Sequence, residues 1–229
     1  MFIRKIVEEI SEKINYIPLH VADNPIGLDY AVQGVKSLLG DGSDVNMIGI
    51  YDIGGIGKTT IARAVYNNIF RHFEGSCFLP DIKEKAINKH GIVQLQQILL
   101  SEILKKKDIK VGDVNRGIPI IKRRLQQTKV LLVLDDVDKL EQLIAGGHDW
   151  FGSGSIIIIT TRDKYLLDAH GVVKLCDVKP LNVEKTLKLF NWHAFKNCKV
   201  GPPYMNISNG ASYRIPLIWK KVYMSAVLH

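Results

Sequence analysis

The chain has 229 residues, of which 46% are hydrophobic and 24% are charged, with a formal net charge of +8 at pH 7. This is the composition of an ordinary soluble globular protein with room for one domain and part of another. Three scattered cysteines (Cys77, Cys176 and Cys198) are too few for a disulfide framework or a zinc site. Residues 1–5 lack a signal-peptide pattern, and no apolar run approaches the roughly 20 residues of a membrane span. We therefore expect a cytoplasmic protein with free thiols and no membrane span.

The basic charge invites a nucleic-acid interpretation, which the distribution of the charge does not favour. The densest basic clusters, at residues 105–107 and 122–124, fall on or at the ends of predicted amphipathic helices. A solvated helix face explains them, and no aromatic side chains are interleaved with them as a stacking platform would require. We do not expect a nucleic-acid partner.

The first part of the chain, residues 1–24, is predicted to be an amphipathic helix followed by a linker. Isoleucine and valine recur at helical spacing over residues 3–14, with charged residues between them. Pro18 ends this helix, and turn-forming residues lead into a second short helix around residues 30–39.

Residues 47–60 are the stretch around which the rest is organised. An apolar run at 47–51 reads as a buried strand, a glycine-rich loop follows, and a helix opens at Thr60. Loop N–H groups and the positive end of a helix dipole then converge where an oxyanion can bind. The loop residues are Gly54, Gly55, Ile56, Gly57, Lys58, Thr59 and Thr60. Lysine supplies a charge for the β and γ phosphates, and Thr59 offers a hydroxyl to Mg²⁺.

Asp52 departs from the full phosphate-loop pattern, which has glycine six residues before the lysine. Aspartate tolerates a left-handed backbone better than most residues, so the loop is still expected to form. Its charge opposes a phosphate by on the order of 2 kcal/mol at ~8 Å and an effective dielectric of about 20. We expect a recognisable nucleotide pocket with weakened affinity.

Downstream segments alternate between helical and strand patterns. Strands are predicted at 77–79, 130–134 and 172–178, and helices at 60–70, 92–105, 118–127 and 164–169. The strand at 130–134 ends in Asp135 and Asp136, which are expected to lie at a ligand crevice. On the functional interpretation Asp135 binds Mg²⁺, directly or through water, and Asp136 polarises an attacking water. The alternative is that this pair forms only a turn or a helix cap.

The apolar run at 156–159 predicts another buried strand, which delivers Thr160, Thr161 and Arg162 to the same crevice. A guanidinium can bind two phosphate oxygens at once, so Arg162 is a candidate γ-phosphate contact. The alternative is a surface ion pair with Asp163 or Asp168. The alternating series predicts an α/β fold with a mostly parallel, doubly wound sheet over residues 25–180.

From residue 182 the pattern changes to helices without a following strand. An apolar helix is predicted around 187–195, another at 204–213, and a last one from Pro216. We therefore predict an incomplete helical subdomain over residues 181–229.

Five stretches in this order resemble the NB-ARC nucleotide-binding module of plant disease-resistance proteins, which are nucleotide-binding, leucine-rich-repeat immune receptors. The stretches are residues 54–60, 73–79, 131–138, 154–163 and 189–195. The segment 73–79 and Asp138 are similar to the subclass with an N-terminal Toll/interleukin-receptor domain. The resemblance implies a P-loop NTPase core, followed here by a partial ARC1-like helical subdomain. It implies a defence switch that is off with ADP, on with ATP, and reset by slow hydrolysis.

The resemblance also implies where the nucleotide lies. It assigns the phosphates to residues 54–60, Mg²⁺ to Thr59 and Asp135, and the γ-phosphate to Arg162. It assigns the adenine to the Ile26–Gly27 backbone and to Pro216. Besides Asp52, Ile156 replaces the basic residue that usually follows Gly-Ser, and residues 214–217 read Arg-Ile-Pro-Leu in place of Gly-Leu-Pro-Leu.

Toll/interleukin-receptor, winged-helix and leucine-rich-repeat segments are not found in this sequence, so we expect a truncated fragment. Three functions are compared: an ADP/ATP-binding module, a true turnover enzyme, and a nucleotide-independent adaptor or decoy that pairs with other immune-receptor chains. The sequence favours the first, with at most slow ATPase activity, because no acceptor site or arginine-rich lid of a kinase is found.

Overall fold

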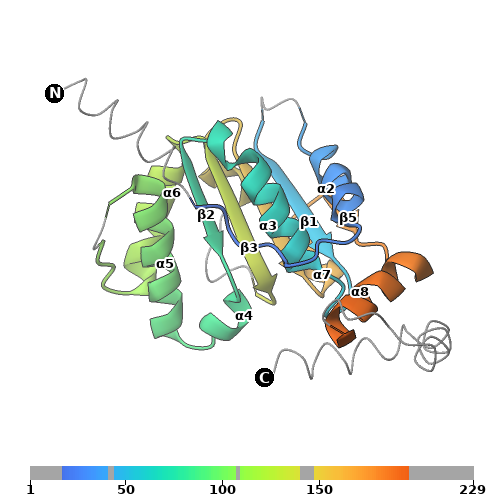
Figure 1. Cartoon of the computed structure of the whole chain (residues 1–229). Coiled ribbons are helices and arrows are strands. Elements are labelled where there is room, and N and C mark those ends of the chain that lie inside the picture. Colours follow the sequence, from blue (N-terminus) through green and yellow to red (C-terminus); the bar gives the residue numbers. More distant parts are fainter. Residues whose placement is uncertain (1–16, 41–43, 107–108, 140–146, 196–229) are drawn as a thin grey trace.

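The computed structural model describes residues 17–40, 44–106, 109–139 and 147–195 (Figure 1). Its first half contains α2 (Leu28–Lys36), β1 (Asn46–Tyr51), α3 (Lys58–Ile69), η1 (Phe70–His72), β2 (Gly75–Leu79), α4 (Ile82–Lys85) and α5 (Lys89–Leu104). Its second half contains α6 (Val114–Leu125), β3 (Val130–Val137), η2 (Gly147–Trp150), β4 (Ile156–Thr161), α7 (Lys164–Ala169), β5 (Lys174–Asp177) and α8 (Val183–Phe195).

The strands form a five-stranded sheet in the order β2-β3-β4-β1-β5, and every pairing in it is parallel. Ile48 in β1 lies opposite Ile158 in β4 and Lys174 in β5, which fixes the register at the centre of the sheet. Strands β3 and β4 are runs of valine, leucine and isoleucine because both of their faces are buried. The predicted parallel sheet is confirmed.

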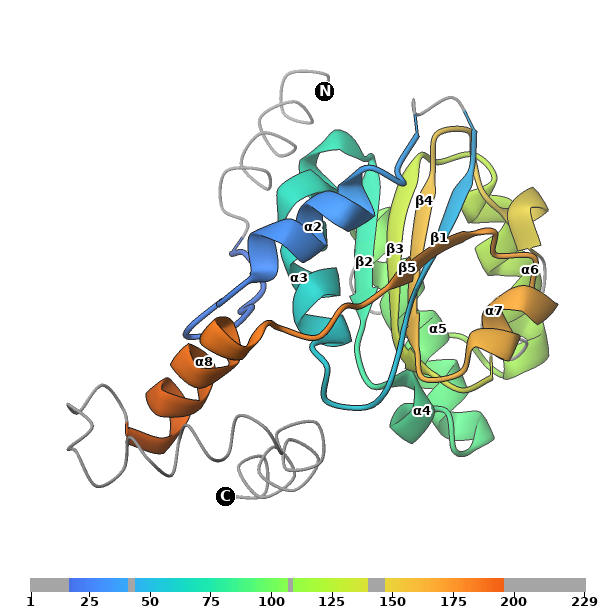
Figure 2. The ribbon, with the colours of Figure 1, turned by 90° about the vertical axis from the view of Figure 1, so that its right-hand side faces the viewer.

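Helices cover both faces of the sheet (Figure 2), so the predicted doubly wound arrangement is also confirmed. On one face, α2 and α3 pack over Ile48, Leu131 and Ile158, with the predicted stripe Ile61, Val65 and Ile69 buried. On the other face, α5, α6 and α7 pack over the alternate residues of the same strands, such as Leu132 and Ile157. Successive strand residues therefore supply two separate cores.

Several boundaries differ from the sequence prediction. Helix α3 begins at Lys58, ahead of the predicted Thr60, so the lysine belongs to the first helical turn. Helix α6 begins at Val114 and not at 118, because the Asp113 side chain accepts hydrogen bonds from the N–H groups of Asn115 and Arg116. The short helix α4 was not predicted.

The chain entering the domain lies along α3. The Asn67 side chain on α3 accepts a hydrogen bond from Leu19 N–H at 3.0 Å and donates one to the Leu19 carbonyl at 2.7 Å. One turn earlier, the Arg63 guanidinium lies 3.5 Å from the His20 carbonyl oxygen. The same helix therefore carries the phosphate loop at its start and holds the linker along its side.

Helix α8 begins at Val183, ahead of the predicted 187. The helices predicted at 3–14, at 204–213 and from Pro216 lie outside the described residues. The division of the chain into residues 1–24, 25–180 and 181–229 stays a prediction. In the part of the chain that the structure describes, none of the helices has the length and apolar character needed to cross a membrane.

Candidate functional site

The glycine-rich loop joins the end of β1 to the start of α3 at the carboxyl edge of the sheet. Gly55 and Gly57 have φ angles of 82° and 104°, where a side chain would strain the backbone. Gly57 is the N-cap of α3, which has no side-chain cap and no acidic residue in its first turn. Within the described part of the chain, the first N–H groups of α3 therefore lack a capping side chain, which is the arrangement of a helix N-terminus that binds an anion.

Lys58 folds back over this loop. Its ammonium group donates hydrogen bonds to the carbonyl oxygens of Asp52 at 2.7 Å and Ile53 at 2.8 Å. The side chain is only 7% exposed, and burial, together with the nearby Arg162 guanidinium, lowers the pKa of Lys58. An anion beside this ammonium would offset both effects, since opposite charge favours the charged form.

Asp52 lies at the start of the loop without disturbing its path. Residues with a positive φ other than glycine are Asp81, Lys105 and Asp136 among those described, so Asp52 has no left-handed backbone here. Its carboxylate accepts a hydrogen bond from the Ile53 N–H. The loop therefore forms without glycine at this position, and what remains of the departure is the negative charge.

Thr59 and Asp135 are brought together as predicted. The Thr59 hydroxyl donates to Oδ1 of Asp135 at 2.9 Å, and the Thr160 hydroxyl donates to the same oxygen at 2.6 Å. Asp135 is fully buried, and its other oxygen, Oδ2, has no hydrogen-bond partner among the residues that the structure describes. Burial raises the pKa of Asp135, while the two hydroxyl donors oppose that rise.

These groups fit a magnesium ion. A buried carboxylate oxygen without a partner is costly, and a divalent cation beside it removes the cost. Carboxylate and hydroxyl oxygens are the ligands that Mg²⁺ prefers, usually with substrate phosphates completing the shell. Asp135 and Thr59 are the residues that would hold this ion, directly or through water.

Asp136 and Arg162 also meet at this edge. The Arg162 Nε lies 3.5 Å from the Asp136 carboxylate, so the ion pair of Arg162 is with Asp136 and not with the Asp163 or Asp168 considered from the sequence. The Asp163 side chain instead caps α7 by accepting from the Tyr165 N–H. A Cβ placed on Gly54 would lie 3.1 Å from Arg162 Nη1, so the guanidinium rests on the phosphate loop.

The predicted adenine residues are only partly described. Gly27 has a φ of 73° and is the N-cap of α2. A Cβ on Gly27 would lie 2.6 Å from Leu181 Cδ2, so the backbone there approaches the segment leading into α8 closely. Pro216 lies outside the described residues. The adenine contacts of Ile26, Gly27 and Pro216 stay a prediction.

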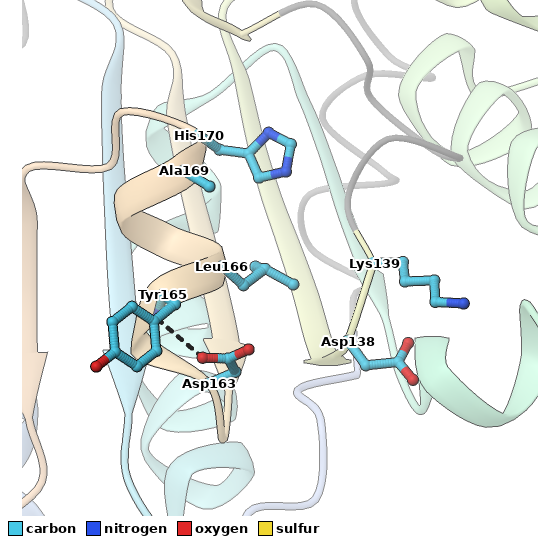
Figure 3. A pocket seen from close by; sticks show the side chains of 7 residues that line it. All are labelled: Asp138, Lys139, Asp163, Tyr165, Leu166, Ala169 and His170. Atoms are coloured by element: carbon cyan, nitrogen blue, oxygen red, sulfur yellow. Dashed lines mark hydrogen bonds between the residues drawn. The ribbon is translucent and has the colours of Figure 1, made fainter.

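A separate open pocket of about 280 Å³ lies between the end of β3 and α7 (Figure 3). It is lined by Asp138, Lys139, Asp163, Tyr165, Leu166, Ala169 and His170. None of the described residues predicted to hold the nucleotide lines it, so it is distinct from the loop site.

Thr160 is the site residue whose role the sequence analysis missed. Its hydroxyl contacts both acidic residues: it donates to the Asp135 side chain and accepts from the Asp136 N–H at 2.8 Å. The available signal was a polar residue directly after a run of four isoleucines and two positions before the arginine.

A parallel doubly wound sheet with a glycine loop at the start of α3 and an acidic pair after β3 defines a P-loop nucleotide-binding fold. The sequence profile of the NB-ARC domain matches residues 28–199, so the chain belongs to the NB-ARC family. The predicted resemblance is confirmed.

Relatives are plant disease-resistance proteins. The chain is 41% identical to TMV resistance protein N of Nicotiana glutinosa over 203 residues, covering 84% of this chain and 17% of that protein. It is 39% identical to Disease resistance protein RUN1 of Vitis rotundifolia, over 95% of this chain and 17% of the relative. The chain thus spans about one sixth of the length of these relatives.

Among solved structures, the Drosophila ORC bound to DNA is similar in fold. The TM-score is 0.53 at 11% sequence identity, with 81% of this chain and 49% of that chain covered. At this identity the likeness concerns the fold alone.

Proposed function

We propose that this chain is the ADP/ATP-binding module of a cytoplasmic plant immune-receptor switch. The observation that carries the proposal is the joint placement of the phosphate loop and the acidic pair. The uncapped start of α3 faces open space at Gly55 and Gly57, and the Thr59–Asp135 contact leaves one buried carboxylate oxygen free. Backbone N–H groups bind phosphate, and this oxygen binds the Mg²⁺ that accompanies it.

Each residue has a role in this proposal. Lys58 exchanges its two loop carbonyls for phosphate oxygens, and Thr59 and Asp135 hold Mg²⁺, whose charge offsets that of the phosphates when it is bound. Arg162, which rests on the loop at Gly54, contacts the γ-phosphate. Asp136 orients the attacking water. The adenine lies against the Ile26–Gly27 backbone and Pro216.

The proposed hydrolysis is slow and serves to reset a switch. Asp136 is bound in an ion pair with Arg162, which leaves the water-orienting carboxylate partly neutralised. We expect turnover well below about 1 per second, the lower end of ordinary enzymes.

Calorimetric titration of the 229-residue chain with Mg-ADP and Mg-ATP tests the proposal. We expect saturable binding that Lys58→Met weakens by at least about tenfold, because a charge-assisted contact to phosphate is lost. Lys122→Met, which changes an exposed lysine on α6 on the other face of the sheet, is the matched control. No heat up to millimolar nucleotide from folded protein would remove the proposal.

A second candidate is a nucleotide-independent adaptor or decoy that pairs with other immune-receptor chains. The observation that favours it is the Asp52 carboxylate beside the loop, which opposes phosphate binding. Co-purification of a receptor partner that is unchanged in Lys58→Met would support this function. Loss of the partner in Lys58→Met would contradict the adaptor function and favour the nucleotide-binding module.

A further inference from the structure

The pairing of β3 with β4 is interrupted at the acidic pair. Pairing is regular as far as Leu134 opposite Ile159, and it resumes at Val137 opposite Thr161. Two residues of β3, Asp135 and Asp136, therefore face a single residue of β4. This is a β-bulge, a feature that redirects side chains and is common beside active sites. Asp136 takes a φ of 49° within it.

The Thr160 side chain spans this bulge. Its hydroxyl oxygen accepts the Asp136 N–H at 2.8 Å, and its proton goes to Asp135 Oδ1 at 2.6 Å. Thr160 is 1% exposed, so water does not substitute for these contacts. A backbone N–H that the interrupted ladder would leave buried and unpaired is satisfied by a side chain instead.

The bulge changes where the two carboxylates point. Consecutive side chains in a regular strand lie on opposite faces, which would separate these two groups. Here Asp135 reaches Thr59 at the start of α3, and Asp136 reaches Arg162 above the loop. With Thr59 and Thr160 both donating to Oδ1, the oxygen left for a cation is Oδ2.

We propose that Thr160 is the positioning residue of this site, because its hydroxyl holds the bulge that directs Asp135 to the magnesium position and Asp136 to Arg162. The inference rests on the proposed nucleotide-binding function. It concerns the magnesium-dependent part of binding, since the two hydrogen bonds of the Thr160 hydroxyl go to the Asp135 carboxylate and the Asp136 backbone and not to the phosphate loop.

The test compares Thr160→Val with Thr161→Val. The neighbouring Thr161 is also fully buried, but its hydroxyl donates to the Val137 carbonyl and accepts from the Asp163 N–H, and neither of these hydrogen bonds involves a carboxylate. ADP binding to the 229-residue chain is titrated calorimetrically in EDTA and at a series of Mg²⁺ concentrations. Circular dichroism and thermal unfolding confirm that each variant is folded.

We expect Thr160→Val to raise the Mg²⁺ concentration needed for half-maximal enhancement of ADP binding by about tenfold or more. Affinity in EDTA should stay within about twofold of the unmodified protein, because the loop N–H groups are untouched. Thr160→Ser, which keeps the hydroxyl, should restore the Mg²⁺ dependence, and Thr161→Val should leave it unchanged.

Equal Mg²⁺ dependence in Thr160→Val and Thr161→Val would overturn the inference while leaving nucleotide binding intact. Unmodified protein that binds ADP without any Mg²⁺ effect would instead contradict the proposed metal site. If Thr160→Val does not fold, Thr160→Ala removes the hydroxyl without adding volume. Unfolding of both, with Thr161→Val folded, would show that the hydroxyl serves stability and would also overturn the inference.

Discussion

Asp52 is the residue at which this loop departs from the phosphate-loop pattern, and its effect can be separated into backbone and charge. The structure has no left-handed backbone at Asp52, so glycine is not required there for the loop to form. The carboxylate, by contrast, lies at the start of a loop built to receive phosphate. We therefore expect Asp52 to affect nucleotide binding through its charge and not through the backbone.

We predict that Asp52→Gly tightens Mg-ADP binding by about tenfold or more, because one unit of like charge near the phosphates is removed. Calorimetry on the two proteins measures the effect. Asp52→Asn is the control for geometry, since its amide oxygen can still accept from the Ile53 N–H while the charge is gone. Equal affinities for all three proteins would show that this carboxylate does not act on the phosphates.

At the scale of the elements, α3 joins the loop to the linker that precedes the domain. Asn67 exchanges two hydrogen bonds with the backbone of Leu19, in the way that a neighbouring strand would. Asn68, the next residue, instead donates to the carbonyl of Ala64 in its own helix. Two adjacent asparagines of one helix therefore differ in whether they hold the linker.

Asn67→Ala should release the linker from α3. We expect hydrogen exchange at the Leu19 amide to become about tenfold faster, because its acceptor is removed without replacement. Asn68→Ala should leave that amide unchanged. Exchange measured by NMR or mass spectrometry on both variants tests this. Similar protection of the Leu19 amide in the two variants would contradict the proposed role of Asn67.

At the scale of the whole molecule, a contact between α5 and the edge strand β2 makes stability depend on pH: Glu102 at the surface of α5 meets the buried Cys77 of β2. The Glu102 carboxylate accepts hydrogen bonds from the Phe78 N–H and the Cys77 thiol. Burial raises the pKa of Glu102 above its ordinary value of 4.5, and burial raises the pKa of Cys77 well above its usual range, so the thiol stays protonated.

The sign of the pH effect follows from the raised pKa of Glu102. Above pH 4.5 the unfolded chain releases this proton before the folded chain does, so the contribution of Glu102 to stability falls as pH rises through the folded pKa. We predict that Glu102→Gln becomes more stable relative to the unmodified protein as pH increases from about 5 to about 8. Urea unfolding at both pH values measures the difference.

Glu84→Gln, on the exposed side of α4, is the control for that experiment. It changes a carboxylate of the same type on a different helix, away from the Cys77 contact. If the stability difference between Glu102→Gln and the unmodified protein is the same at both pH values, the raised pKa of Glu102 is contradicted.

Much of this molecule followed from short-range patterns. The apolar runs at 47–51, 130–134 and 156–159 predicted buried parallel strands, because a strand covered on both faces must be apolar at every position. The glycine and lysine pattern at 54–58 predicted an anion site, since loop conformation and helix start are set by neighbouring residues. Helix ends were predicted less accurately. Helix α6 begins directly after Asp113 because the Asp113 side chain caps the first turn, a contact that periodicity does not reveal.

The sequence by itself therefore determined the fold class, the loop and the family, all of which depend on local pattern and on residue order. Tertiary structure alone decided which groups meet across the sheet: the Arg162 pair with Asp136, the Thr160 contacts with the Asp135 carboxylate and the Asp136 N–H, and the burial that leaves Asp135 Oδ2 without a partner among the described residues. The reason is physical. These contacts join residues about 25 positions apart whose side chains meet only through the register of β3 and β4 and its bulge, and a register shift of one residue reverses every side chain.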